Sequence, residues 1–233
     1  AMRWLVYRLT KSELLLGVVG FASDIPVFFL VPVAGAIADK FKRHHILAIT
    51  QSLAALHAFI LAILVYSGHI AVWHIVVLGV ISGIINAFDI PARQAFLIDV
   101  VENKEDLGNA IALNSFIFNG ALLVGPSIAG VLIAVFGEAP CFILNGVSYL
   151  ALIGALFFMK IPKPTIASAN LKIGRGILEG ANYAFRSVPI RSILLLVALV
   201  SFMSVSYIML MPVFAASILH GGPQTFGYLM SAT

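Results

Sequence analysis

The stretch Gly35-Ala-Ile-Ala-Asp-Lys-Phe-Lys-Arg-His-His45 decides how the rest of the sequence is interpreted. It separates an apolar run that ends near Ala38 from another that begins at Ile46. Lys40, Lys42 and Arg43 carry charges that are costly to bury in hydrocarbon. The stretch is therefore expected to lie in water as a turn between two membrane-spanning helices.

The composition of the whole sequence supports this interpretation. Of its 233 residues, 61% are hydrophobic and 10% are charged, whereas a soluble domain is about 45–50% apolar and about 25% charged. Several apolar runs are long enough to span a bilayer, so we predict an all-α, polytopic integral membrane protein. The single cysteine, Cys141, excludes an internal disulfide framework and a thiolate metal site. No metal, cofactor or nucleic-acid partner is predicted.

Eight spans are expected, of which the first and the last are incomplete. They cover residues 1–9, 14–38, 46–66, 70–88, 109–136, 141–159 and 190–219, with an eighth starting after residue 224. Both ends of the sequence lie in apolar stretches, so we expect a fragment of a longer protein. Residues 1–159 are expected to form an N-terminal half, and residues 190–233 the start of a second half. Between them, residues 160–189 are expected to be a linker with an amphipathic helix over residues 171–186.

The distribution of basic residues predicts the orientation. Most Lys and Arg residues lie in the turns after spans two, four and six, whereas the turns on the other side hold only Lys11, with Arg3 and Arg8 close to it in the incomplete first span. The positive-inside rule places the lysine- and arginine-rich turns in the cytoplasm.

Two motifs carry a resemblance to a known family. Gly35-x-x-x-Asp39-Lys40-x-x-Arg43 resembles the signature between spans two and three of the major facilitator superfamily, although Lys42 and His44 depart from it. The run Phe88-Asp-Ile-Pro-Ala-Arg-Gln94 is similar to the branch that contains drug and siderophore exporters. The resemblance implies two six-helix halves in the intact protein.

A third motif lies in span five. Gly120-Ala-Leu-Leu-Val-Gly125-Pro126-Ser-Ile-Ala-Gly130 looks like the Gly-Pro motif of antiporters. The resemblance implies a tight contact on the outward side, and ordinary helix packing is the alternative. Many drug exporters also carry an arginine in span four, four residues before a glycine. Here Gly79 takes that place before Gly83, which puts an arginine-mediated proton relay in doubt.

The resemblance also implies roles for the residues of the turn. Asp39 would be the carboxylate of a conformational latch, with Lys40 and Arg43 as its cationic surroundings and Arg93 as a plausible partner. Gly35 would allow another helix to approach closely. The alternative is a turn that only sets orientation, which explains the bases but not Gly35 and Asp39. Near Arg93, Pro91 disfavours a continuous helix, so Asp89 is expected to be the N-cap of a short helix over residues 90–101.

Asp24 is the only acid expected well inside a span. It is eleven residues from Gly35, so the two differ by only about 20° around a helix axis. Asp24 is therefore expected to face the protein interior or a central cavity, on the same side as Gly35. Two interpretations stay open: proton coupling or binding of a cationic substrate group, and a neutral residue that only packs helices. Asn114, Asn119 and Tyr207 are weaker candidates for a cavity lining.

These observations predict a secondary active transporter, not an enzyme, in a bacterial cytoplasmic membrane. We expect proton-coupled antiport that exports a drug-like compound or a siderophore by alternating access. The partners are then a small-molecule substrate, protons and membrane lipid, and the intact protein is expected to be a monomer. The alternatives are a carrier of the same fold for another cargo, such as a lysophospholipid, and a membrane-embedded enzyme or a channel.

Overall fold

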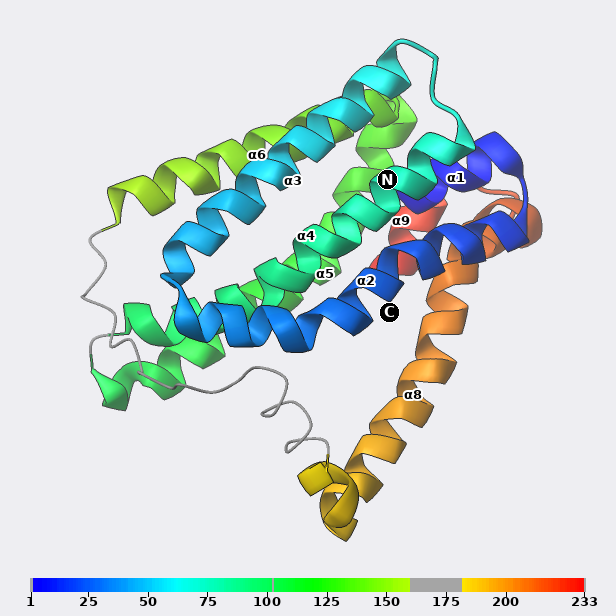
Figure 1. The fold of residues 1–233 in the computed structure, drawn as a ribbon. Helices are drawn as coiled ribbons and strands as arrows, with labels where there is room; N and C mark the ends of the chain where they lie inside the picture. Colours follow the sequence, from blue (N-terminus) through cyan, green and yellow to red (C-terminus); the bar gives the residue numbers. More distant parts are fainter. Residues whose placement is uncertain (1, 102, 160–181, 233) are drawn as a thin grey trace.

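The computed structural model describes residues 2–101, 103–159 and 182–232, without the side chains of residues 104 and 202–206. Within these ranges every regular element is a helix (Figure 1). The α-helices are α1 (Met2–Thr10), α2 (Glu13–Lys40), α3 (Arg43–Tyr66), α4 (Val72–Val100), α5 (Leu107–Phe136), α6 (Glu138–Phe158), α8 (Val188–Val213) and α9 (Pro223–Ser231). A 3₁₀ turn (Lys104–Asp106) precedes α5, and a π-helical turn (Phe214–Ile218) follows α8.

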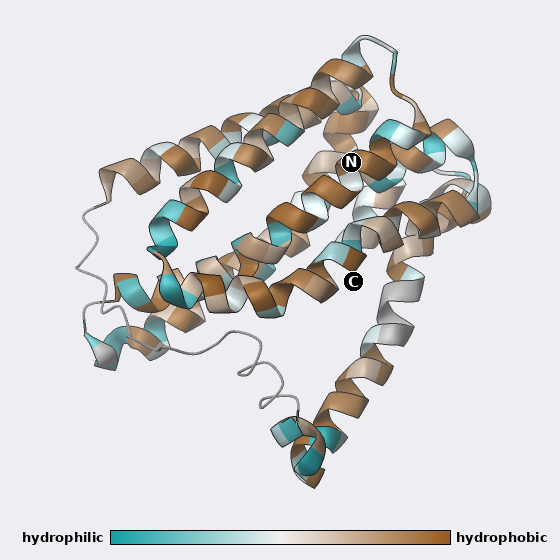
Figure 2. Cartoon of the chain, in the orientation of Figure 1, coloured by the Kyte–Doolittle hydropathy of each residue, from teal (hydrophilic) through white to brown (hydrophobic). Residues whose placement is uncertain are grey.

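Five of these helices, α2 to α6, are long and apolar enough to cross a membrane. Each has at least the roughly 20 residues that a bilayer core requires. Hydrophobic residues follow the lengths of the helices, and the polar residues gather at the turns (Figure 2). The predicted all-α, polytopic membrane fold is thus confirmed. The predicted amphipathic helix over residues 171–186 lies largely outside the described residues.

Helix α4 is longer than the predicted span four, which was expected to end at residue 88. It continues through Pro91 to Val100, so Asp89 lies inside the helix and the prediction that it is an N-cap is wrong. Proline removes one backbone hydrogen bond. Side chains of α3 and α4 supply polar contacts around this point, because Asp89 is buried and accepts hydrogen bonds from Thr50, Gln51 and Arg93.

The closest packing within the first six spans joins α2 to α4. A Cβ atom added at Gly83 would lie 2.1 Å from the backbone oxygen of Ser23. One turn earlier, a Cβ at Gly79 would lie 2.7 Å from Ser23 Oγ. At Gly83 the backbone of α2 leaves no room for a side chain, whereas at Gly79 the nearest atom is a side-chain hydroxyl.

The last described helices contact the first six spans on one side only. We call the side that carries residues 40–43 the basic side, and the other the opposite side. On the opposite side, Trp4 of α1 stacks on Phe226 of α9 with ring centroids 5.8 Å apart. Tyr7 Oη and Ser217 Oγ share a hydrogen bond of 2.6 Å. Toward the basic side α8 diverges from α2 (Figure 1).

Candidate functional site

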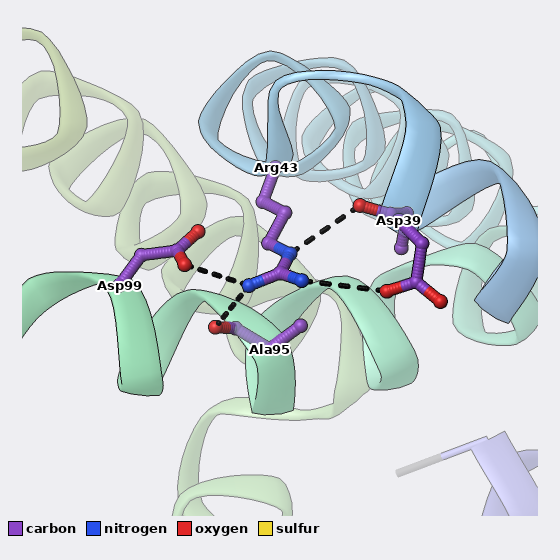
Figure 3. A network of polar contacts seen from close by, with 5 residues as sticks. Asp39, Arg43, Ala95 and Asp99 are labelled. Atoms are coloured by element: carbon purple, nitrogen blue, oxygen red, sulfur yellow. Dashed lines mark hydrogen bonds and ion pairs between the residues drawn. The ribbon is translucent and has the colours of Figure 1, made fainter. Parts of the chain in front are cut away.

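Arg43 lies at the centre of the polar network on the basic side, where α2, α3 and α4 meet (Figure 3). Its Nη1 donates to Asp99 Oδ1 at 2.6 Å and to the Ala95 carbonyl at 3.1 Å. Its Nη2 donates to Asp39 Oδ1 at 3.3 Å, and its Nε donates to the Ala38 carbonyl at 3.3 Å. A guanidinium has five N–H donors in one plane, so a single arginine can bind all of these acceptors.

The helix ends explain why Arg43 lies here. Helix α2 ends at Lys40 and α3 begins at Arg43, so the chain reverses direction within two residues. The last four carbonyl groups of a helix lack partners within it, and the negative end of the helix dipole attracts a cation. The bond from Arg43 to the Ala38 carbonyl satisfies one of these groups.

The two carboxylates bound to Arg43 have different environments. The Asp99 side chain is 21% exposed, whereas the Asp39 side chain is 72% exposed. Exposed ion pairs contribute only about 0–1 kcal/mol, because water screens them. Asp99 is therefore the partner that holds Arg43, and Asp39 presents most of its carboxylate to the surroundings.

Asp99 is the residue that the sequence analysis missed. It is an acid within the apolar run Ala95-Phe-Leu-Ile-Asp-Val-Val101. Once α4 is known to continue past Pro91, Asp99 falls in its last turn, level with the basic turn. The signal was present, but the predicted end of span four at residue 88 concealed it.

Arg93 does not reach Asp39. Its Nη2 donates to Asp89 Oδ2 at 2.5 Å, one turn away on α4. The same carboxylate accepts from Thr50 Oγ1 at 2.8 Å and from Gln51 Nε2 at 2.6 Å, which links α3 to α4. The pairing proposed between Arg93 and Asp39 is thus corrected: Arg93 is exposed and pairs with a second polar cluster, in which Asp89, Thr50 and Gln51 are buried.

The candidate glycines differ in their surroundings. A Cβ added at Gly35, Gly120 or Gly125 would meet no described atom within 4 Å. At Gly130 it would lie 2.6 Å from the Pro223 carbonyl oxygen and 3.0 Å from Gly227 Cα, so α5 and α9 cross with their backbones in contact. Ser127 Oγ donates to Ser231 Oγ at 2.8 Å beside this crossing.

Pro126 also belongs to this crossing, because its carbonyl oxygen would lie 2.5 Å from a Cβ at Gly227. Helix α5 continues through this proline without interruption. Of the motif in span five, the part from Pro126 to Gly130 therefore forms the close contact with α9.

The remaining candidates are exposed. Among the described residues, Asp24 has no hydrogen-bond or ion-pair partner. It lies one turn from Gly20, where a Cβ atom would meet the Met209 side chain of α8 at 2.1 Å. Asn119 Nδ2 donates to the Ser115 carbonyl of its own helix at 2.7 Å. Asn114 and Tyr207 are exposed, and the structure brings neither to Asp24 by any described contact.

Comparison with known proteins gives the family. A family model described as "transmembrane secretion effector" (MFS_3) matches residues 1–233. The chain is 31% identical to the staphyloferrin A transporter of Staphylococcus aureus over 236 residues, which is 99% of this chain and 58% of the relative. It is 24% identical to the multidrug efflux pump Tap of Mycolicibacterium fortuitum over 200 residues, 83% of this chain and 49% of the relative. The chain thus spans about half the length of these curated relatives.

The chain belongs to the transmembrane secretion effector family of major facilitator transporters. This confirms the resemblance drawn from the motif between spans two and three, and the relatives are transporters rather than enzymes. The apolar helices and the bacterial relatives agree with a multi-pass integral protein of the bacterial cytoplasmic membrane.

Proposed function

We propose that the intact protein is a secondary active exporter in which protons drive the efflux of a small molecule by antiport. The names of the relatives support a drug-like compound or a siderophore as cargo, since one transports staphyloferrin A and another is a multidrug efflux pump. Protons, membrane lipid and a monomeric state belong to the same proposal. The mechanism is alternating access, with two halves rocking around a central cavity.

The observation that carries the proposal is the one-sided contact between the halves. Gly130 and Gly227, Trp4 and Phe226, and Tyr7 and Ser217 all meet on the opposite side. On the basic side α8 stands apart from α2 (Figure 1). An arrangement closed at one end and open at the other is one of the two states that alternating access requires.

In this proposal the network around Arg43 is the conformational latch. Arg43 and Asp99 fix the turn to α4, and the exposed carboxylate of Asp39 is left to bind the second half when the basic side closes. Gly35 supports this role, because the space beside it is open for another helix. Lys40, which is exposed, adds positive charge at the same place.

Asp24 is proposed to couple proton movement to transport. It lies on the same face of α2 as Gly20, which contacts α8, so the proposed rocking of the halves would change its solvation. A carboxylate at this depth costs about 2.5–3.5 kcal/mol on insertion scales, which favours a functional reason for keeping it.

The test is proton-driven efflux by the full-length protein in inverted membrane vesicles, with ethidium as the fluorescent cargo and a panel of other drugs and siderophores beside it. We expect an imposed proton gradient to drive uptake into the vesicles, and Asp24→Asn to lower the rate at least tenfold and remove its pH dependence. Glu105→Gln, which removes an exposed acid near α5, is the matched control and should transport normally. Unchanged pH dependence in Asp24→Asn would refute the coupling role of Asp24, and cargo movement without a proton gradient would refute antiport.

A further inference from the structure

The two arginines of α1 differ, because only Arg8 has a partner among the described residues. Arg8 Nε pairs with Glu138 Oε1 at 2.9 Å, and the Glu138 side chain is only 6% exposed. Arg3 has no hydrogen-bond or ion-pair partner within the described ranges 2–101, 103–159 and 182–232. Arg3 precedes the end of α1 at Thr10 by two helical turns, about 10 Å at 1.5 Å per residue. With α1 as the end of the predicted first span, Arg3 lies at a depth where an unpaired guanidinium is costly.

Arg3 lies on the wall of a cavity of about 340 Å³ between α1, α5 and α9. The rest of that wall is apolar and includes Pro126, Ile133 and Phe226. Gly125 also lines it, and a Cβ added there would meet open space. The cavity thus combines one cation with apolar walls at the boundary between the first six spans and α9.

Such a combination selects one kind of ligand. A cavity of about 300–1,000 Å³ with apolar walls and few polar groups is typical of a small-molecule site. The planar guanidinium binds a carboxylate through two parallel hydrogen bonds, and this pairing is strongest away from water. The aromatic ring of Phe226, backed by Trp4, offers a face for a flat apolar group.

We propose that this cavity binds an organic anion, a carboxylate on an apolar or aromatic body, with Arg3 as the anion-binding residue. The assignment of this anion as cargo rests on the proposed export function, whereas its binding does not. Asp24 is not part of the cavity wall, so the anion site and the proposed proton site are separate.

Binding to the purified full-length protein in dodecyl maltoside tests the proposal. The probes are naphthalene-2-carboxylate and naphthalene-2-carboxamide, which share a shape and differ in charge. Titration calorimetry should show at least tenfold tighter binding of the carboxylate. Arg3→Gln should reduce its affinity to that of the amide, and Arg3→Lys should retain part of the preference. Gly125→Leu, which fills the cavity, should weaken both probes.

Lys11→Gln is the matched control, because it removes a positive charge from the exposed turn after α1 without touching the cavity. It should bind both probes as the wild type does. Equal binding of the two probes by the wild type, or an unchanged preference in Arg3→Gln, would overturn the proposal. So would displacement of the bound carboxylate by added phosphatidylglycerol, which would assign Arg3 to a lipid phosphate.

The proposed export function and the proposed anion site can be refuted independently of each other. Loss of proton-driven ethidium efflux in the wild type, with selective carboxylate binding intact, would refute export and leave the anion site in place. Normal ethidium efflux in a protein that does not discriminate the two probes would refute the anion site alone.

Discussion

Arg43 contacts the ends of three helices, and its bonds differ in what they contribute. The bond to Asp99 is short and partly buried, whereas the bond to Asp39 is long and exposed. Charged hydrogen bonds removed from water contribute more than exposed ones. At the scale of the residue, Asp99 therefore supports the structure, whereas Asp39 is the carboxylate of the proposed latch.

We expect Arg43→Gln to lower the free energy of unfolding by about 1–3 kcal/mol, because it leaves Asp99 partly buried without its cation. Asp39→Asn should cost less than about 1 kcal/mol, since that pair is exposed, yet it should slow transport if Asp39 belongs to a latch. Thermal unfolding in detergent and efflux in vesicles measure the two effects. Equal destabilisation by both substitutions would contradict the assignment.

The buried cluster around Asp89 gives a second prediction. Asp89→Leu leaves Arg93, Thr50 and Gln51 without their shared acceptor and should destabilise the protein by about 2–4 kcal/mol. Gln51→Met should cost about 1 kcal/mol or less, because the buried Oε1 of Gln51 has no partner among the described residues and its removal offsets the lost bond. Unfolding midpoints of both variants in the same detergent test the order. A larger cost for Gln51→Met would show that Asp89 is not the centre of the cluster.

At the scale of the helix, glycine decides where two backbones meet. Gly83 lies against Ser23 in the crossing of α2 and α4, and Gly130 lies against Gly227 in the crossing of α5 and α9. Small residues permit this approach between membrane helices, where packing rather than hydrophobicity drives association. Gly35 and Gly120 have no such neighbour among the described atoms, although they belong to similar motifs.

The crossing of α5 and α9 can be tested by disulfide formation. Ser127→Cys and Ser231→Cys, in a background that lacks other cysteines, should cross-link readily because the native oxygens are 2.8 Å apart. Adding Gly227→Leu should greatly reduce the cross-link, since even a Cβ atom there would lie 2.5 Å from the Pro126 carbonyl oxygen.

Gly120→Leu is the control for that experiment and should leave the cross-link unchanged, because the space around Gly120 is open. Efficient cross-linking in the Gly227→Leu variant would mean that α5 and α9 do not meet as described.

Much of the fold follows from hydropathy alone. The five apolar helices and the turns between them were predictable because a bilayer imposes their length. The exception is α4, where Pro91 was taken as an end. Membrane helices tolerate proline, and two of the three partners of Asp89, Thr50 and Gln51, come from α3, so local sequence could not reveal them.

The site was predictable to a smaller extent. The motif indicated Asp39 and Arg43 correctly as neighbours, because they are four residues apart across the turn. The pair of Arg93 with Asp89 lies within α4 and was missed because the helix was expected to end at residue 88, whereas the pair of Arg43 with Asp99 depends on the rotation of α4 relative to α3. That rotation is a property of packing, and periodicity within one helix does not determine it.

At the scale of the whole molecule, the orientation of the protein in the membrane can be tested separately from its fold. We expect Lys42→Cys to react with a membrane-impermeant maleimide in inverted vesicles and Lys11→Cys to react only in right-side-out ones, because the positive-inside rule places the basic turn in the cytoplasm. Replacement of Cys141 by serine removes the thiol that this chain already has. The reverse labelling pattern would show that the protein has the opposite orientation in the membrane.

The glycine contact between α5 and α9 has a consequence for biosynthesis. Chains are made from the N-terminus, at roughly 5–20 residues per second, so α5 enters the membrane seconds before α9 exists. During that interval the backbone at Gly130 lacks the residues of α9 that cover it in the folded chain. The nascent protein therefore carries an unoccupied docking groove, and a ribosome that stalls between the two helices should leave an intermediate that membrane proteases recognise at this point.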